Sequence, residues 1–124
     1  MRTNTLASFL LRFPEVTEEW PFGPDVDVYK VDGKIFAILA PDDEPPQISL
    51  KCDPLLALEL RNEYSAVSAG YHLNKDHWNT VRLDDTVPDG DLKQMIAHSY
   101  ECVVRGMAKK ARDRIALTYK GAQK

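Results

Sequence analysis

The feature that most constrains the fold is the Asp32-Gly33 pair, which stands between two runs of β-prone residues. Asp-Gly is strongly preferred in two-residue type I′ turns, so residues 26–31 and 34–39 are predicted to form a β-hairpin. Such a turn fixes the strand register, which places Tyr29 opposite Phe36. Strands joined in this way pair antiparallel, so the sequence predicts an antiparallel sheet.

Three further segments are predicted to form helices. The first helix has an apolar stripe and ends at Pro14, and its stripe consists of Leu6, Phe9, Leu10 and Phe13. Asp53-Pro54 is typical of a helix start and predicts a helix to about Tyr64. A last helix is predicted to begin at Asp89 or Asp91 and to end or bend at Gly106, with a buried stripe of Leu92, Met95, Ile96, Ser99, Tyr100 and Val103.

Alternation along the strands sorts their side chains onto two faces. Residues 47–51 and 78–84 alternate like the hairpin and are predicted to be strands. The face predicted to pack against helices is apolar and carries Val26, Val28, Ile35, Ala37, Leu39, Ile48, Leu50, Val81 and Leu83. The opposite, open face is predicted to carry aromatic and basic side chains, namely Tyr29, Lys34, Phe36, Lys51, Trp78 and Arg82, together with Asp27, Ile38, Ser49 and Thr80.

These elements predict an α+β fold of the two-layer sandwich type, with helices packed on one face of the antiparallel sheet. The predicted order is α-β-β-β-α-β-β-α. A chain of 124 residues is the size of one domain, which we place at residues 1–117, with a basic C-terminal tail at 118–124.

Composition narrows the cellular setting. No apolar run approaches the ~20 residues that span a membrane, and the N-terminus lacks the pattern of a signal peptide, so a cytoplasmic protein without membrane contact is expected. Two widely spaced cysteines, Cys52 and Cys102, then favour buried thiols, with a disulfide as the alternative. The oligomeric state is expected to be a monomer or a weak dimer.

Charge is distributed unevenly. The first 104 residues have a net charge of −9, whereas the segment from Arg105 onward holds seven basic residues and one acid, Asp113. A basic segment of this kind suits nucleic acid or an acidic partner. The alternative is a solvated helix end, which the negative pole of the preceding helix would favour.

The segment from Gly70 to Asn79 is the richest in chemistry, because a stretch that only turned the chain would use small residues. Large hydrogen-bonding and aromatic side chains crowd it instead, namely Tyr71, His72, Asn74, Lys75, His77 and Trp78. This composition indicates a binding surface. Together with the aromatic and basic open face, it favours base stacking and phosphate contacts, and hence a nucleic-acid-binding domain without catalytic activity.

Three alternatives to nucleic acid stay open. A protein partner could use the same open face. A small molecule or a reaction could use His72, Lys75 and His77. The aromatic side chains could also be covered by loops or by the basic tail as a second small core.

Several kinds of chemistry lack a sequence signature. There is no Walker-type or Rossmann glycine pattern. Neither cysteine stands at the spacing of a zinc finger, and the spacing of His72 and His77 matches no common metal site. We therefore predict no cofactor, no metal and no catalytic residue.

Two strings resemble the MmcQ/YjbR family: Lys51-Cys52-Asp53-Pro54 after Ile48-Ser49-Leu50, and Gly70 to Val81, read as GYHLNKDHWNTV. His98-Ser99-Tyr100, Pro21-Phe22-Gly23 and the lysines after Met107 resemble it too, so the likeness covers about residues 5 to 117. It implies a small bacterial domain with a frataxin-like or secretion-chaperone-like α+β sandwich. Members are described as DNA-binding proteins with a double-wing motif, and no catalytic residues are carried over. Residues 3–13 contain no Asp or Glu, so the acidic ridge of a frataxin-like iron site is missing.

Overall fold

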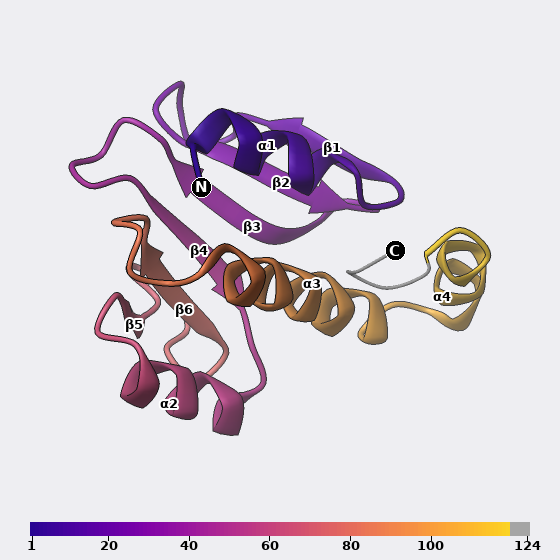
Figure 1. The fold of residues 1–124 in the computed structure, drawn as a ribbon. Coiled ribbons are helices and arrows are strands. Elements are labelled where there is room, and N and C mark those ends of the chain that lie inside the picture. The colour runs from indigo at the N-terminus through magenta and orange to yellow at the C-terminus, as the bar shows by residue number, and fades with distance from the viewer. Residues whose placement is uncertain (120–124) are drawn as a thin grey trace.

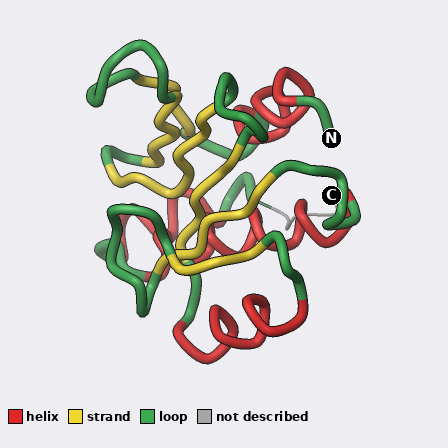
Figure 2. The backbone as a smooth tube through the Cα atoms, turned by 90° about the vertical axis from the view of Figure 1, so that its left-hand side faces the viewer, coloured by secondary structure: helices red, strands yellow, loops and turns green. Residues whose placement is uncertain are grey.

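One six-stranded antiparallel sheet, with strand order β1-β2-β3-β4-β6-β5, forms the centre of the protein. The computed structural model describes residues 1–119 (Figure 1). The strands are β1 (Val16–Glu19), β2 (Asp27–Val31), β3 (Lys34–Ala40), β4 (Gln47–Lys51), β5 (Val67–Ala69) and β6 (Trp78–Arg82). Figure 2 shows them as a twisted layer through the middle of the molecule.

Helices pack on one face of this sheet, so the predicted α+β fold is confirmed. They are α1 (Thr3–Leu11), α2 (Pro54–Glu63), α3 (Asp89–Arg105) and α4 (Lys109–Ala116). In Figure 1, α1 lies across β1 and β2, and α3 lies in front of the central strands. None of the helices within residues 1–119 combines the length and the apolarity that a bilayer crossing needs.

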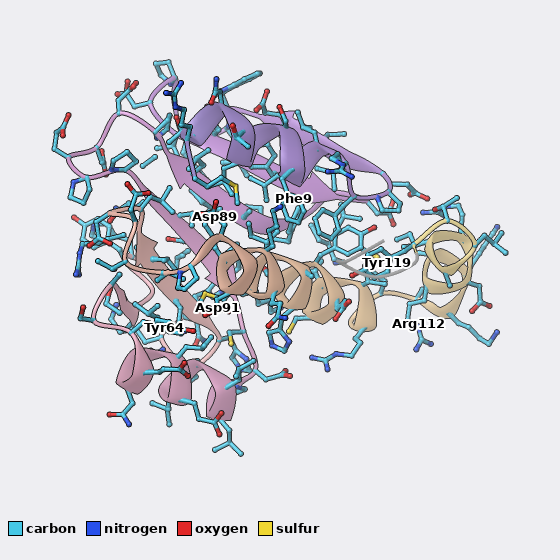
Figure 3. The ribbon with its side chains drawn as sticks, viewed as in Figure 1. Phe9, Tyr64, Asp89, Asp91, Arg112 and Tyr119 are labelled. Carbon is cyan, nitrogen blue, oxygen red and sulfur yellow. The ribbon has the colours of Figure 1, made fainter. Side chains whose placement is uncertain are left out.

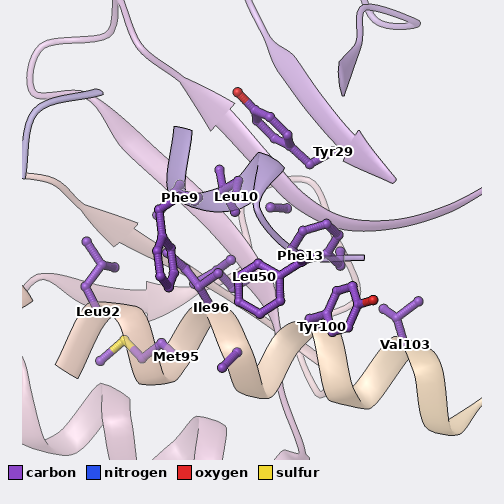
Figure 4. Packing of buried hydrophobic residues seen from close by; sticks show 14 of the residues in the cluster. Phe9, Leu10, Phe13, Tyr29, Leu50, Leu92, Met95, Ile96, Tyr100 and Val103 are labelled. Atoms are coloured by element: carbon purple, nitrogen blue, oxygen red, sulfur yellow. The ribbon is translucent and has the colours of Figure 1, made fainter. Parts of the chain in front are cut away.

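The main core lies between α1, α3 and the covered face of the sheet (Figure 4). The apolar stripes predicted for the first and last helices are buried, including Leu6, Phe9, Leu10, Leu92, Met95, Ile96, Tyr100 and Val103. Phe13 follows α1 and stacks near Tyr100, with 4.8 Å between ring centroids. Aromatic pairs of this kind add about 0.5–1.5 kcal/mol to the stabilisation that comes from the area they bury.

A β-bulge corrects the predicted hairpin. Val31 pairs with Lys34 as the two-residue turn requires, but the register shifts between Tyr29 and Lys30, so that Tyr29 pairs with Ala37. Phe36 is therefore not opposite Tyr29, and the prediction that the two residues pair across the strands is wrong. A bulge places one extra residue in one strand, which turns the following side chains to the other face.

The bulge places both aromatic residues of the hairpin in the core. Tyr29 and Phe36 are fully buried, so their predicted positions on the open face are wrong. The Tyr29 hydroxyl donates to Glu18 Oε2 at 2.5 Å, and the Phe36 ring lies 5.5 Å from that of Tyr100. Val28, predicted to face the helices, belongs instead to the cross-strand row of Ile38, Ser49 and Thr80 on the open face.

Two elements were absent from the predicted order, and both are short. β1 has only four residues and pairs with β2 at the sheet edge. α4 lies within the segment that the sequence marked only as basic. Tyr119, in the predicted tail, packs its ring 5.1 Å from that of Tyr100, while residues 120–124 of that tail lie outside the described part of the chain.

Candidate functional site

A groove of about 430 Å³ lies on the open face of the sheet. Its floor comes from β3 and β4, and its walls come from the loops after β1, β3 and β5. The lining residues are Phe22, Asp25, Val26, Ile38, Ala40, Asp43, Gln47, Ser49, Tyr71, His72 and Leu73. Grooves of this volume are the ordinary size of small-ligand and peptide-anchor sites.

Two aromatic side chains stand exposed at this groove. Phe22 is 61% exposed and Tyr71 is 64% exposed. The Tyr71 ring lies 4.0 Å from the ring of His72, whose backbone takes the left-handed conformation with φ +58°. Left-handed backbone in a residue other than glycine is uncommon and gathers at binding and turn positions. Large apolar side chains held in water at a groove are typical of interaction surfaces.

Hydrogen bonds fix the loop that carries Tyr71 to the sheet. The Tyr71 backbone N–H donates to the Thr80 hydroxyl at 3.0 Å, and that hydroxyl lies 2.8 Å from the hydroxyl of buried Ser49. The Gly70 N–H donates to the Trp78 carbonyl at 2.8 Å. Lys75 Nζ donates to the Gly70 carbonyl at 2.9 Å, so this lysine closes the loop on itself.

Much of the motif at residues 70–79 therefore holds the structure together. The Asn74 side-chain oxygen accepts a hydrogen bond from the Asp76 N–H at 2.9 Å. Trp78 is half-buried, and its backbone carbonyl accepts a hydrogen bond from the Gly70 N–H. Buried Asn79 joins β6 to α2, because Arg61 Nε donates to its side-chain oxygen at 2.7 Å. Arg61, which the sequence did not single out, also donates to the Lys75 carbonyl.

Of the segment predicted to form a binding surface, Tyr71, His72 and Leu73 line the groove. His77 is exposed and lies outside it. Lys51 and Arg82 stand at opposite ends of the β4–β6 ladder, roughly 13 Å apart along the strands at the usual rise per residue. Lys34 is exposed beside the hairpin turn, so the basic residues do not form one patch on the described surface.

Three basic residues of the C-terminal segment, Arg105, Lys109 and Arg114, form ion pairs with acids. Arg114 contacts both carboxylate oxygens of Glu15 at 2.8 Å, and Lys109 Nζ lies 2.7 Å from Asp113. The Arg114 pair holds the pKa of Glu15 below its usual value, with the hydrogen bond from Arg114 as the main cause. Part of the positive charge of this segment thus neutralises the acidic body of the protein.

A second cavity, of about 350 Å³, lies between α2, α3 and the covered face. Its lining mixes apolar side chains with Lys51, Cys52, Tyr64, Asn79, Asp91, Gln94 and His98. Tyr64, the residue after α2, donates a hydrogen bond to Asp91 of α3 (Figure 3). Lys51, predicted for the open face, therefore lies at this cavity.

Next to this cavity, Asp53, His98, Cys102 and Arg105 form a polar cluster. Both cysteines are buried and free, as predicted. Burial raises the pKa of Cys102, and it raises the pKa of Cys52 to about 12. The hydrogen bond from Arg105 lowers the pKa of Asp53. Sequence reasoning missed this cluster, although His98 and Cys102 stand four residues apart on a predicted helix and so share one face.

Comparisons with known proteins agree with this fold. The YjbR family model matches residues 11–102. The uncharacterized protein YbdF of Escherichia coli O157:H7 is 37% identical over 112 residues, which cover 90% of this chain and 92% of that protein. The uncharacterized protein YjbR of Escherichia coli K12 is 40% identical over 75 residues, covering 60% of this chain and 64% of that protein.

Solved structures give the same result. The crystal structure of the Deinococcus radiodurans protein DR2400, a DUF419 domain, superposes with a TM-score of 0.86 at 34% identity, covering 93% of this chain and 88% of that one. A Pseudomonas syringae protein matches with a TM-score of 0.70 at 22% identity, covering 82% of this chain and 98% of that one, a likeness that concerns the fold alone.

Proposed function

The chain belongs to the YjbR family, and on the geometry of its open face we propose that it is a non-catalytic binding module whose groove holds a short segment of a partner protein. One observation carries the proposal: Phe22 and Tyr71 stand exposed at a preformed groove whose floor includes the apolar side chains of Ile38 and Ala40. Covering these surfaces removes apolar area from water, which favours association by about 25 cal/mol per Å² before the costs of binding.

The charges at the groove select the kind of segment. Asp25 and Asp43 line it, and the β3–β4 loop adds Asp42 and Glu44. None of the described residues that line it is a lysine or an arginine. An extended segment that places an apolar side chain in the groove and a Lys or Arg next to it complements this surface. Charge complementarity of this kind adds specificity and speeds association.

The fixed loop supports a binding role. Because Thr80 and Lys75 anchor residues 70–75, Tyr71 is held in place before a partner arrives. Preorganisation lowers the entropy cost of ordering an interface on binding. Tyr and Phe anchors that fill or flank such grooves commonly provide much of the binding energy.

Nucleic acid, including double-wing DNA binding, stays a prediction and becomes an outcome of the test. The separation of Lys51 from Arg82 and the ion pairs of Lys109 and Arg114 weigh against it, because phosphate binding needs several cations on one surface. The small-molecule alternative around His72, Lys75 and His77 is also weaker, because Lys75 Nζ is engaged in holding its own loop. A cytoplasmic monomer or weak dimer stays the predicted setting.

A displayed library of random peptides tests the proposal. Peptides are selected for binding to the wild-type protein in the presence of an excess of the soluble Phe22→Ser/Tyr71→Ser double variant. This competitor captures the peptides that bind outside the groove. The expected consensus has one large apolar residue beside Lys or Arg. A synthetic consensus peptide, labelled with a fluorophore, is then titrated against single variants.

Tyr71→Ala and Phe22→Ala are each expected to weaken binding of that peptide by about 1–2 kcal/mol or more. Lys34→Ala and Arg82→Ala are matched controls outside the groove and should leave the affinity unchanged. Labelled single- and double-stranded oligonucleotides are titrated in parallel over a range of salt. Failure to enrich peptides over the double variant, or oligonucleotide binding with a steep salt dependence that Lys34 and Arg82 control, overturns the proposal in favour of nucleic acid.

A further inference from the structure

The cluster beside the N-terminus of α2 brings three metal-ligating side chains together on the side of the sheet away from the groove. His98 and Cys102 lie one turn apart on α3, with 3.3 Å between His98 Nε2 and Cys102 Sγ. Asp53, the residue before α2, contributes its carboxylate. Asp53 Oδ2 lies 3.6 Å from His98 Nε2, and Asp53 Oδ1 lies 3.8 Å from Cys102 Sγ.

These separations match the edges of a tetrahedral zinc site. Zinc binds sulfur at about 2.3 Å, imidazole nitrogen at about 2.0–2.1 Å and carboxylate oxygen at about 2.0–2.2 Å, so at tetrahedral angles its ligand atoms stand about 3.4–3.6 Å apart. The sulfur–nitrogen and nitrogen–oxygen separations in the cluster are close to these values. A small rotation of the Asp53 carboxylate brings one oxygen within reach of both other ligands.

We propose that Asp53, His98 and Cys102 form a zinc site with a fourth position left for water or a ligand. A donor set of one thiolate, one imidazole and one carboxylate suits Zn²⁺, whereas Mg²⁺ and Ca²⁺ prefer oxygen alone. Three protein ligands with an open position are typical of zinc sites that bind or activate a further molecule. Binding displaces the thiol proton of Cys102 to solvent.

Exposure supports access from one side. The Cys102 side chain is nearly buried, His98 is 23% exposed and Asp53 is 48% exposed, so the site opens toward solvent at Asp53. His98 also lines the cavity of about 350 Å³ between α2 and α3. A metal held by these residues therefore lies next to a chamber large enough for a small ligand.

Two groups, the Arg105 guanidinium and the Asp53 backbone N–H, compete with the metal for its ligand atoms. Arg105 Nη2 lies 2.8 Å from Asp53 Oδ1 and 3.3 Å from Cys102 Sγ. The Asp53 backbone N–H donates to His98 Nε2 at 3.2 Å. The Arg105 side chain is 62% exposed, so it can turn into solvent at little cost when a cation takes its place. Arg105 should therefore act as a built-in competitor of zinc.

Cobalt and zinc titrations test the site. Co²⁺ added to the wild-type protein, kept reduced with a phosphine that does not bind metal, should give a sulfur-to-cobalt charge-transfer band and the intense visible bands of tetrahedral Co²⁺. Zn²⁺ should abolish both by displacement. A chromophoric chelator in competition gives the zinc affinity. An octahedral Co²⁺ spectrum without the charge-transfer band contradicts the proposal.

Matched variants identify the ligands. Cys102→Ala and His98→Gln should lower the zinc affinity by more than about 10-fold. Cys52→Ala and His77→Gln are controls, because they replace a buried thiol and an exposed imidazole outside the cluster, and they should leave the zinc affinity unchanged. Arg105→Gln should raise the zinc affinity, because it removes the competing guanidinium.

Arg105→Gln is the decisive variant if a ligand variant fails to fold, because it removes only an exposed side chain. Equal zinc affinity in the wild type, Cys102→Ala and Arg105→Gln overturns the zinc site. The peptide titrations of the groove are unaffected by that result, since no residue of the cluster lines the groove.

Discussion

The two faces of the sheet differ in what their side chains do, although neighbouring residues of the same strands build both. On the covered face, Tyr29, Ala37, Leu50 and Asn79 form one cross-strand row. The next row, Val28, Ile38, Ser49 and Thr80, lies on the open face. The first row packs against helices, whereas the second ends in a hydroxyl pair that anchors a loop beside a groove.

Aromatic residues show the difference most clearly. Phe36 is fully buried under α3, and Phe22 is 61% exposed at the groove. The first ring stabilises the fold by leaving water, and the second is expected to stabilise a complex in the same way. Aromatic composition alone therefore does not separate a core position from a binding position, and strand register does.

Loss of a ring from the covered face should have the largest effect. Phe36→Ala removes a side chain that packs against Phe13 and Tyr100, so the free energy of unfolding should fall by about 3–5 kcal/mol. Urea denaturation followed by circular dichroism measures it. Phe22→Ala is the matched control and should change the free energy of unfolding by less than about 0.5 kcal/mol. Similar losses for the two variants would contradict the division between the faces.

Substitution at Gly70 should have the next largest effect. A Cβ added at Gly70 would lie 2.6 Å from the Trp78 Cβ and 3.0 Å from the Trp78 carbonyl oxygen, neither of which is the end of a flexible side chain. Gly70→Ala should therefore cost about 1–3 kcal/mol of unfolding free energy. Gly90→Ala, where a Cβ meets nothing within 4 Å, should be neutral or stabilising by up to about 1 kcal/mol. An unchanged melting temperature of Gly70→Ala would contradict this prediction and show that the loop of residues 70–77 shifts to accept the added Cβ without loss of stability.

The buried hydroxyl pair on the open face gives a smaller effect with a distinctive pattern. Thr80→Val leaves Ser49 and the Tyr71 N–H without their partner, at a cost of about 1–2 kcal/mol. The double variant Ser49→Ala/Thr80→Val should lose less unfolding free energy than the sum of the losses in the two single variants, because a buried hydroxyl without a partner destabilises more than its absence. A double-mutant cycle in urea measures this coupling, and simple additivity would argue that the pair does not join the sheet to the loop.

The smallest effect concerns alkaline pH. Burial raises the pKa of Cys52 from 9.0 to about 12, so the unfolded chain loses this proton first as pH rises. The contribution of this thiol to the free energy of unfolding is fully present below pH 9 and is lost between pH 9 and about 12. At pH 10 the free energy of unfolding should have fallen by about 1 kcal/mol. Unfolding free energies of wild type and Cys52→Ala at pH 8 and pH 10 measure the difference. An identical pH dependence in both proteins would show that the thiol is not shielded from water.

Local patterns in the sequence predicted most of the fold. Helical periodicity located the buried stripes of α1 and α3, and Asp53-Pro54 located the start of α2. The Asp32-Gly33 turn predicted the hairpin and the pairing of Val31 with Lys34 correctly. The bulge at Phe36 escaped prediction because no local signal marks an inserted residue in a run such as Lys34-Ile35-Phe36-Ala37.

The candidate site was only partly predictable for the same reason. The segment from Gly70 to Asn79 was recognised as unusual, but which of its side chains hold the loop depends on contacts with β6 and α2. The groove combines residues from distant segments, so no single stretch of sequence carries it. The cluster of Asp53 with His98 and Cys102 likewise depends on how α2 meets α3, and only the spacing of His98 and Cys102 was visible beforehand.

The central claim is that the open-face groove binds a protein segment while the covered face supplies stability. Amide chemical-shift mapping of the labelled protein with the selected peptide tests it most directly. We expect the largest shifts at Ile38, Ser49, Tyr71 and His72, which line the groove, and small shifts along α3 on the covered face. Shifts concentrated on α4, or spread over Lys34, Lys51 and Arg82 without the groove residues, would contradict it.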